Sequence, residues 1–113
     1  GGARLDHMLG NVGLLEWLTD QGVASTLLHR SNRMRMLKGP ATWNIIKSPF
    51  SYISLIPVTS VVTGVTTQGL LYPLHNQTLY RGMTLGISNE LTGKQGTVFI
   101  EHGKCLGIES KDL

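Results

Sequence analysis

Residues 96–109 read GTVFIEHGKCLGIE, two runs of β-branched and other apolar residues separated by His102-Gly103. Glycine tolerates the positive φ that tight turns need, so this stretch predicts a β-hairpin between strands at 96–101 and 104–109. Similar short runs recur upstream, and five further strands are expected at residues 24–29, 33–36, 42–46, 52–56 and 61–65. Because no helical pattern follows Gly22, the strands indicate a mainly β fold, either an antiparallel sandwich or a barrel.

The N-terminal part of the chain follows a helical period instead. Its apolar residues recur at steps of three and four from Leu5 to about Asp20, which places one set on a single helix face: Leu5, Met8, Leu9, Val12, Leu15 and Leu18. The opposite side carries Leu14 and Trp17 and is less polar than a free surface, so we expect a second partner to cover it. Gly22 is a conventional helix stop. The sequence thus predicts one helix within residues 1–22 and a β domain over residues 23–113.

The composition is that of a folded protein. Of the 113 residues, 41% are hydrophobic and only 15% are charged, which supplies a buried core and argues against general disorder. The single cysteine cannot form an internal disulfide, and no charged-then-apolar leader stands at the N-terminus, so a cytoplasmic location is expected. No apolar run approaches the roughly 20 residues that span a bilayer, and no membrane partner is expected.

The basic residues give a weak signal for an anionic partner. The net charge is +3, and only Arg30, Arg33, Arg35 and Lys38 cluster. A nucleic-acid reader would normally place aromatic residues between such positions, and this stretch has none. We therefore expect a solvated strand face rather than a phosphate-binding patch, and no nucleic-acid partner, with a small basic nucleic-acid binder kept as the weakest alternative.

The first residues of the chain contain a possible anion site. The backbone N–H groups at a helix start are unpaired, so the small-residue turn Gly1-Gly2-Ala3 before the helix suits a phosphate group. Arg4 would add a bidentate contact to the phosphate, and Asp6 would hold Mg²⁺ or accept a hydrogen bond from a substrate amine. The alternative is that Asp6 caps the helix and Arg4 lies in water, and spacing alone favours that alternative.

Other motifs are weak when each is taken alone. Tyr72 by itself is typical of a strand or core aromatic, and Gly86-Ile87-Ser88-Asn89 is typical of an ordinary turn. The glycine spacing of residues 64–69 is that of a phosphate-binding loop, but Leu70 and Leu71 stand where lysine and a hydroxyl residue are required. The cysteine and histidines lack the spacing of zinc ligands, so no metal cage is proposed from the residues themselves.

In combination, these segments resemble the C-terminal portion of a bacterial-type thiamine pyrophosphokinase. The resemblance covers nearly the whole chain and is carried, in order, by Gly2-Ala3-Arg4-Leu5-Asp6-His7 with Asn11, Ser54-Leu55-Ile56-Pro57, Thr63-Gly64-Val65-Thr66-Thr67, Gly69-Leu70-Leu71-Tyr72-Pro73-Leu74, Gly86-Ile87-Ser88-Asn89-Glu90 and Ser110-Lys111-Asp112. That family transfers the terminal diphosphate of ATP to the hydroxyethyl group of thiamine, which gives thiamine diphosphate and AMP. The resemblance implies a thiamine-binding β-sandwich preceded by the last helix of a truncated α/β nucleotide-binding domain.

The resemblance also implies roles for particular residues. Arg4 and His7 are expected to contact ATP phosphate, and Asp6 is the expected catalytic residue, in contact with substrate or metal. Thiamine is expected to contact Tyr72, Ser88 and Asn89, although the residue pattern alone favours a turn-forming role for Asn89. Mg²⁺ would be held mostly by residues outside this sequence, and the active site would join two subunits of a homodimer. Alone, this chain is expected to be nearly inactive, and a non-catalytic ligand-binding or dimerisation module remains the alternative.

Overall fold

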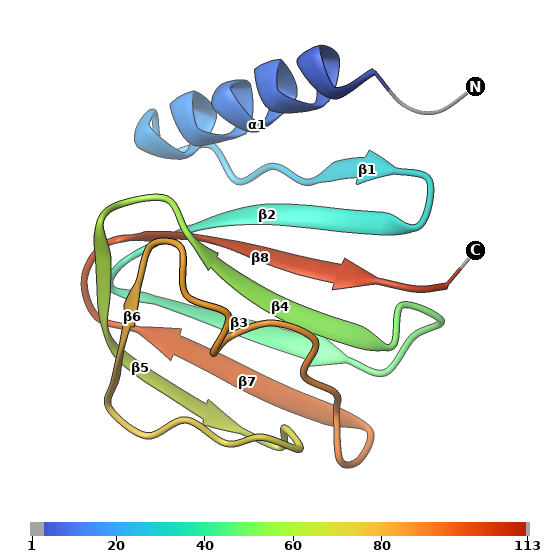
Figure 1. The fold of residues 1–113 in the computed structure, drawn as a ribbon, viewed down its shortest axis with the longest axis vertical. Helices are drawn as coiled ribbons and strands as arrows, with labels where there is room; N and C mark the ends of the chain where they lie inside the picture. Colours follow the sequence, from blue (N-terminus) through green and yellow to red (C-terminus); the bar gives the residue numbers. More distant parts are fainter. Residues whose placement is uncertain (1–3, 113) are drawn as a thin grey trace.

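The protein is a β-sandwich with one helix packed on its outside (Figure 1). The computed structural model describes residues 4–112. Its elements are α1 (Leu5–Asp20), β1 (Leu27–His29), β2 (Asn32–Lys38), β3 (Ala41–Ile46), β4 (Tyr52–Pro57), β5 (Val61–Gln68), β6 (Gln77–Tyr80), β7 (Gln95–Ile100) and β8 (Lys104–Ser110). Sheet A has the strand order β1-β2-β8-β4 and sheet B the order β3-β7-β5-β6, with antiparallel pairing throughout. The mainly β sandwich expected from the sequence is confirmed.

The sequence placed seven of the eight strands and missed β6. Strand β6 begins with Gln77 and Thr78, contains one buried side chain, Leu79, and ends at the exposed Tyr80. It pairs with β5 at only three positions, with a register shift between Val62 and Val65. A strand this short and polar carries no period-2 signal in the sequence. Its place in the sheet depends on its pairing with β5.

The hairpin predicted at His102-Gly103 is wrong. Strands β7 and β8 belong to different sheets, so the turn between them is an arch that crosses the sandwich. A Cβ at Gly103, where φ is +98°, would lie 2.6 Å from the carbonyl oxygen of Val61. The Gly103 carbonyl accepts the N–H of Gly39 at 2.9 Å, which ties this arch to the β2–β3 crossing. Glycine marked the turn correctly, but the partners of each strand lie far away in sequence.

The sandwich core lies between the two sheets and is almost wholly aliphatic. Val62, Val65, Val98 and Ile100 are fully buried, and Ile53 is 1% exposed. Alternate residues of each strand point inward, as the period of 2 requires. Each such side chain contributes about 1.5–3 kcal/mol when it leaves water.

Helix α1 covers the outer face of sheet A at β1 and β2. Leu15 is 3% exposed and packs with Met8 and Val12 against Met34 and Met36 of β2. The ammonium group of Lys104 binds the carboxylates of Glu16 and Asp20 at 2.9 and 2.8 Å, which fixes the C-terminal half of the helix. Within residues 4–112, no helix is long and apolar enough to cross a membrane.

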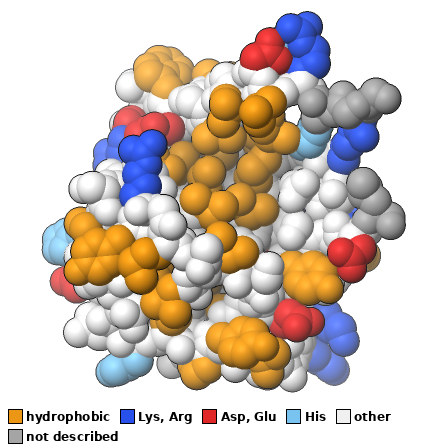
Figure 2. All heavy atoms as spheres, in the orientation of Figure 1, with side chains coloured by type: hydrophobic (Ala, Val, Ile, Leu, Met, Phe, Trp, Pro, Cys, Tyr) orange, Lys and Arg blue, Asp and Glu red, His pale blue; other side chains and the backbone are white. Residues whose placement is uncertain are grey.

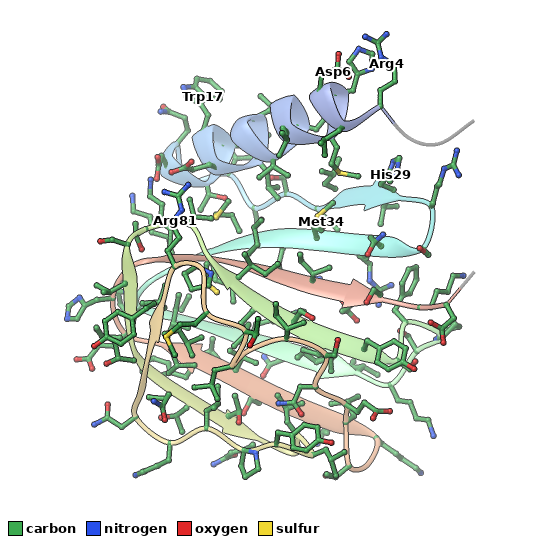
Figure 3. The ribbon with its side chains drawn as sticks, viewed as in Figure 1. Arg4, Asp6, Trp17, His29, Met34 and Arg81 are labelled. Atoms are coloured by element: carbon green, nitrogen blue, oxygen red, sulfur yellow. The ribbon has the colours of Figure 1, made fainter. Side chains whose placement is uncertain are left out.

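Two of the helix residues predicted to face the core are exposed. Leu5 and Leu9 are 69% and 61% exposed, because the stripe that meets the sheet is restricted to Met8, Val12 and Leu15. The second apolar side around Leu14 and Trp17 is also open to solvent, and Figure 3 shows Trp17 pointing away from the sheets. Figure 2 shows hydrophobic side chains running in a band from the helix onto the sheet beneath it.

The expected solvated basic face is also wrong for two of its members. Arg33 binds Glu109 through two hydrogen bonds, Nη2 to Oε2 at 2.7 Å and Nε to Oε1 at 3.0 Å, and the Glu109 side chain is only 4% exposed. Arg35 lies 3.9 Å from the same carboxylate. The guanidinium groups stack on the rings of Phe50 and Trp43, at 4.6 and 5.3 Å from the ring centroids. These arginines are structural, and their aromatic partners come from a loop and strand outside the basic run.

Candidate functional site

One side of the sandwich is closed by an irregular segment, residues 86–92, which we call the flank segment. It connects the free edge of β4 in sheet A with the loop that follows β5 in sheet B. Its backbone hydrogen bonds are Leu55 N–H to Gly86 O at 2.8 Å, an exchange between Ile53 and Asn89 at 2.8 Å each way, Leu71 N–H to Glu90 O at 2.8 Å and Thr92 N–H to Gly69 O at 2.9 Å. Gly86 permits this close approach, because a Cβ there would lie 2.8 Å from the carbonyl oxygen of Leu55.

Asn89 connects the flank segment to the backbone of Tyr72. Its side-chain Oδ1 accepts the N–H of Tyr72 at 2.9 Å, and its Nδ2 donates to the carbonyl of Tyr72 at 2.7 Å. Oδ1 also accepts the N–H of Glu90 at 3.0 Å, and Asn89 is only 7% exposed. A carboxamide presents an N–H donor and a carbonyl acceptor side by side, as a peptide group does, so Asn89 forms a side-chain version of a β-bridge with Tyr72.

Ser88 adopts a backbone conformation that is unusual for a residue with a side chain. Its φ is +60°, in the left-handed region, which costs roughly 1–2 kcal/mol for an L residue. Its N–H donates to Oγ of Ser54 at 2.9 Å, and Ser54, on β4, is 8% exposed. Ser54 belongs to a family-like motif with no expected role, and no local pattern links it to a residue 34 positions away.

The structure therefore brings the three predicted thiamine contacts, Tyr72, Ser88 and Asn89, into one region. Ser88 directly precedes Asn89, whose side chain holds Tyr72, and both Tyr72 and Ser88 are exposed. Tyr72 is 62% exposed, and the neighbouring Leu71 and Ile87 are 49% and 43% exposed. An exposed aromatic side chain and an exposed hydroxyl on two joined segments suit a flat heterocycle with hydrogen-bonding edges. Whether these side chains contact thiamine stays a prediction.

The second predicted group lies at the start of α1. Nη2 of Arg4 binds Oδ2 of Asp6 at 2.8 Å, and their side chains are 69% and 62% exposed. Oδ1 of Asp6 accepts the N–H of His7 at 2.9 Å, so Asp6 satisfies one N–H of the first turn while its other oxygen meets Arg4. Figure 3 shows Arg4 and Asp6 at the free end of the helix. The expected turn Gly1-Gly2-Ala3 lies outside the described residues.

The two groups are not joined within this chain. Helix α1 packs on β1 and β2, whereas the flank segment lies along β4, the opposite edge strand of sheet A. Within residues 4–112, no hydrogen bond or ion pair connects Arg4, Asp6 or His7 with Tyr72 or Ser88. A site that uses both groups therefore needs a second surface.

The described residues provide no metal cage and no activated thiol. Among residues 4–112, no group of three or more histidine, cysteine, aspartate or glutamate side chains is placed to hold a metal ion. Burial raises the pKa of the Cys105 thiol to about 12, so the thiol stays protonated at neutral pH. A hollow of about 380 Å³ lies beside the flank segment and is lined by Lys47, Lys94 and Glu90, and neither Tyr72 nor Ser88 reaches it.

Comparison with known proteins gives one consistent result. The family model described as "Thiamin pyrophosphokinase, vitamin B1 binding domain" matches residues 42–105, more than half of the chain. The thiamine pyrophosphokinase of Bacillus subtilis strain 168 is 36% identical over 112 residues, which cover 98% of this chain and 52% of the relative. The chain spans about half the length of the relatives it matches.

Solved structures agree with that match. The crystal structure of thiamine pyrophosphokinase from Bacillus subtilis superposes with a TM-score of 0.91 at 36% identity, covering 100% of this chain and 53% of that one. The thiamin pyrophosphokinase of Geobacillus thermodenitrificans gives 0.86 at 37% identity, over 99% of this chain and 51% of that one. The Candida albicans thiamin pyrophosphokinase is 18% identical with a TM-score of 0.78, over 97% of this chain and 42% of that one, which supports the fold alone. The chain belongs to the thiamin pyrophosphokinase family and contains its vitamin B1 binding domain.

Proposed function

We propose that this chain supplies the thiamine-binding surface of an enzyme that transfers diphosphate from ATP to thiamine. The observation that carries the proposal is the Asn89 bridge, which sets the exposed ring of Tyr72 beside the flank segment that presents Ser88. Family membership supplies the substrate class. The comparisons do not favour the alternative of a non-catalytic module.

Thiamine joins a cationic thiazolium ring to an aminopyrimidine ring, and the two exposed groups match these parts. The π face of Tyr72 attracts a cation by about 0.5–2 kcal/mol. The hydroxyl of Ser88 both donates and accepts, which suits a ring that carries amine and imine nitrogens. The exposed apolar side chains of Leu71 and Ile87 extend this surface under a bound ring.

In the proposed reaction, the thiamine hydroxyl oxygen attacks the β-phosphorus of ATP in line with the bond to the leaving AMP. A bond forms between that oxygen and the β-phosphorus, the α–β bridging bond breaks, and the hydroxyl proton leaves. Arg4 and His7 are proposed to contact the phosphates, and Asp6 to contact substrate or metal. The described residues offer Mg²⁺ a single nearby carboxylate, Asp6, which Arg4 already binds, so we assign no metal site to this chain.

We further propose that residues 1–22 are the last helix of a nucleotide-binding domain and residues 23–113 the thiamine-binding domain, within a homodimer. The placement of α1 and the flank segment at opposite edges of sheet A supports a site shared between subunits. The exposed side chains of Leu14 and Trp17 support a covered helix face in the assembled protein.

Calorimetric titration of the complete protein with thiamine tests the proposal. Tyr72→Ala is expected to weaken thiamine binding by about 2- to 30-fold, since each 1.4 kcal/mol is tenfold in affinity. The matched controls are Tyr80→Ala, an exposed tyrosine on β6, and Ser60→Ala for Ser88→Ala. Unchanged affinity in both Tyr72→Ala and Ser88→Ala would refute the site, and a coupled assay of AMP release then separates an enzyme from a binding module.

A further inference from the structure

We infer that Asn89 and Ser54 are positioning residues, which fix Tyr72 and Ser88 for the ligand without touching it themselves. This inference rests on the proposed function, because it concerns the same surface. It reassigns Asn89, which the family resemblance implied as a thiamine contact, and it adds Ser54, which had no expected role.

The side-chain oxygen and nitrogen of Asn89 both form hydrogen bonds with the protein backbone. Oδ1 accepts two N–H groups, from Tyr72 and Glu90, and Nδ2 donates to the Tyr72 carbonyl at 2.7 Å. The side chain is buried, with 7% of the residue exposed, while Tyr72 is 62% exposed. Both backbone groups of Tyr72 are therefore held and its ring is free. This is the arrangement of a support for a ligand contact.

Ser54 supports Ser88 in the same way. The Ser88 N–H would be unpaired in the left-handed conformation without Oγ of Ser54, which accepts it at 2.9 Å. The backbone on either side is fixed as well, by Leu55 N–H to Gly86 O and by the two Asn89 bonds to Ile53, each at 2.8 Å. Between these fixed points, the Ser54 bond sets the peptide plane of Ser88 and so the direction of the Cα–Cβ bond that carries its exposed hydroxyl.

The two supports come from different parts of the fold but act on one surface. Ser54 lies on β4 of sheet A, whereas Asn89 lies in the flank segment and binds the Tyr72 loop, which follows β5 of sheet B. The flank segment connects them through the isolated backbone bridges Ile53–Asn89 and Leu70–Leu91. These bridges hold the two segments together, and the side-chain bonds of Ser54 and Asn89 then fix the backbone at Ser88 and Tyr72. Loss of either support should misplace one ligand contact while the sandwich core stays intact.

Double-mutant cycles on thiamine affinity test this inference in the complete protein. Asn89→Ala should weaken binding by about three- to tenfold when Tyr72 is present and have no further effect in a Tyr72→Ala background. Likewise, Ser54→Ala should weaken binding by a similar factor, and this effect should vanish in a Ser88→Ala background. In the diphosphate-transfer assay, the KM for thiamine should rise by the same factor with little change in kcat.

Conservative variants separate positioning from general damage to the fold. Ser54→Thr keeps the acceptor oxygen and should restore affinity, and Asn89→Asp keeps Oδ1 for the Tyr72 N–H but loses the donor to its carbonyl, so it should be intermediate. Asn44→Ala, on the exposed face of β3, is the matched control for truncation of an asparagine. Melting temperatures identify any variant that fails to fold; if Asn89→Ala is one, Asn89→Asp and the Ser54 cycle provide the test.

Each outcome has a distinct meaning. Additive effects, in which Ser54→Ala or Asn89→Ala weakens binding equally in either background, would show a direct ligand contact and overturn the inference. Unchanged thiamine affinity in folded Ser54→Ala and Asn89→Asp would overturn it as well. Failure of the unaltered protein to bind thiamine would instead refute the proposed function. This outcome is seen in the first titration, before any variant is made.

Discussion

Replacement of Glu109 by glutamine tests the interpretation that the basic residues of β2 are structural. The Glu109 side chain is 4% exposed and receives two hydrogen bonds from Arg33 and a longer contact from Arg35. Glutamine keeps the size and one acceptor oxygen, but it leaves two guanidinium groups without their counter-charge. Removal of one partner of a fully buried ion pair costs about 3–5 kcal/mol. Because the arginine side chains are 30% and 35% exposed, water relieves part of that cost, and we expect about 1–3 kcal/mol.

Urea denaturation is the appropriate assay, since guanidinium chloride would itself screen the ion pair. Fluorescence of Trp43, which is 2% exposed and stacked under Arg35, reports on this region, and circular dichroism reports on the whole fold. Glu101→Gln is the matched control, because that side chain is 58% exposed and its contact with His102 is 3.9 Å long. A loss of stability no greater than that of Glu101→Gln would refute the reasoning. So would a loss that disappears in 1 M NaCl, because a buried pair is poorly screened.

Three further predictions follow from the helix and the core. Leu15→Ala should lower the free energy of unfolding by about 2–4 kcal/mol in urea titrations, whereas Leu9→Ala, at a position 61% exposed, should change it by less than about 0.5 kcal/mol. Hydrogen bonds from Lys104 and Lys38 lower the pKa of Asp20 below its ordinary value of 3.8. The Asp20 carboxylate therefore stabilises the fold above pH 3.8, and this stabilisation is lost as the pH falls through the pKa of Asp20 in the folded protein. Asp20→Asn should remove that part of the acid dependence in thermal melts. The Cys105 thiol should react with Ellman's reagent at pH 8 only as fast as the protein unfolds, and prompt labelling of folded protein would contradict its burial.

The sequence was a good guide to local structure and a poor guide to pairing. Helix α1 matches the predicted span, because period and glycine stop are encoded in adjacent residues. The turn at His102-Gly103 was also predicted, but the strands on either side of it, β7 and β8, belong to different sheets. Packing of the core decides which strands pair, and the turn alone does not. Strand β6 escaped notice because a strand of four residues with two polar leading positions has no visible period.

The candidate site shows the same division between local and distant information. Family-like motifs singled out Tyr72 and Ser88, and the structure places their loops together. The residue pattern favoured a turn-forming role for Asn89, and its hydrogen bonds reach the backbone of Tyr72, 17 residues away. Ser54 could not have been given a role from sequence, because its contact depends on the flank segment lying against the edge of β4.

The central position of strand β8 in sheet A affects how this protein folds during synthesis. Strand β8 is the last strand in the chain, yet it lies inside sheet A, with β2 on one side and β4 on the other. Until residues 104–110 leave the ribosome, β4 has no partner strand in sheet A and β2 can pair only with the three-residue β1, so their apolar faces stay largely exposed. Sheet A should therefore remain open to chaperones and proteases until β8 has emerged, and should then form in one late, cooperative step.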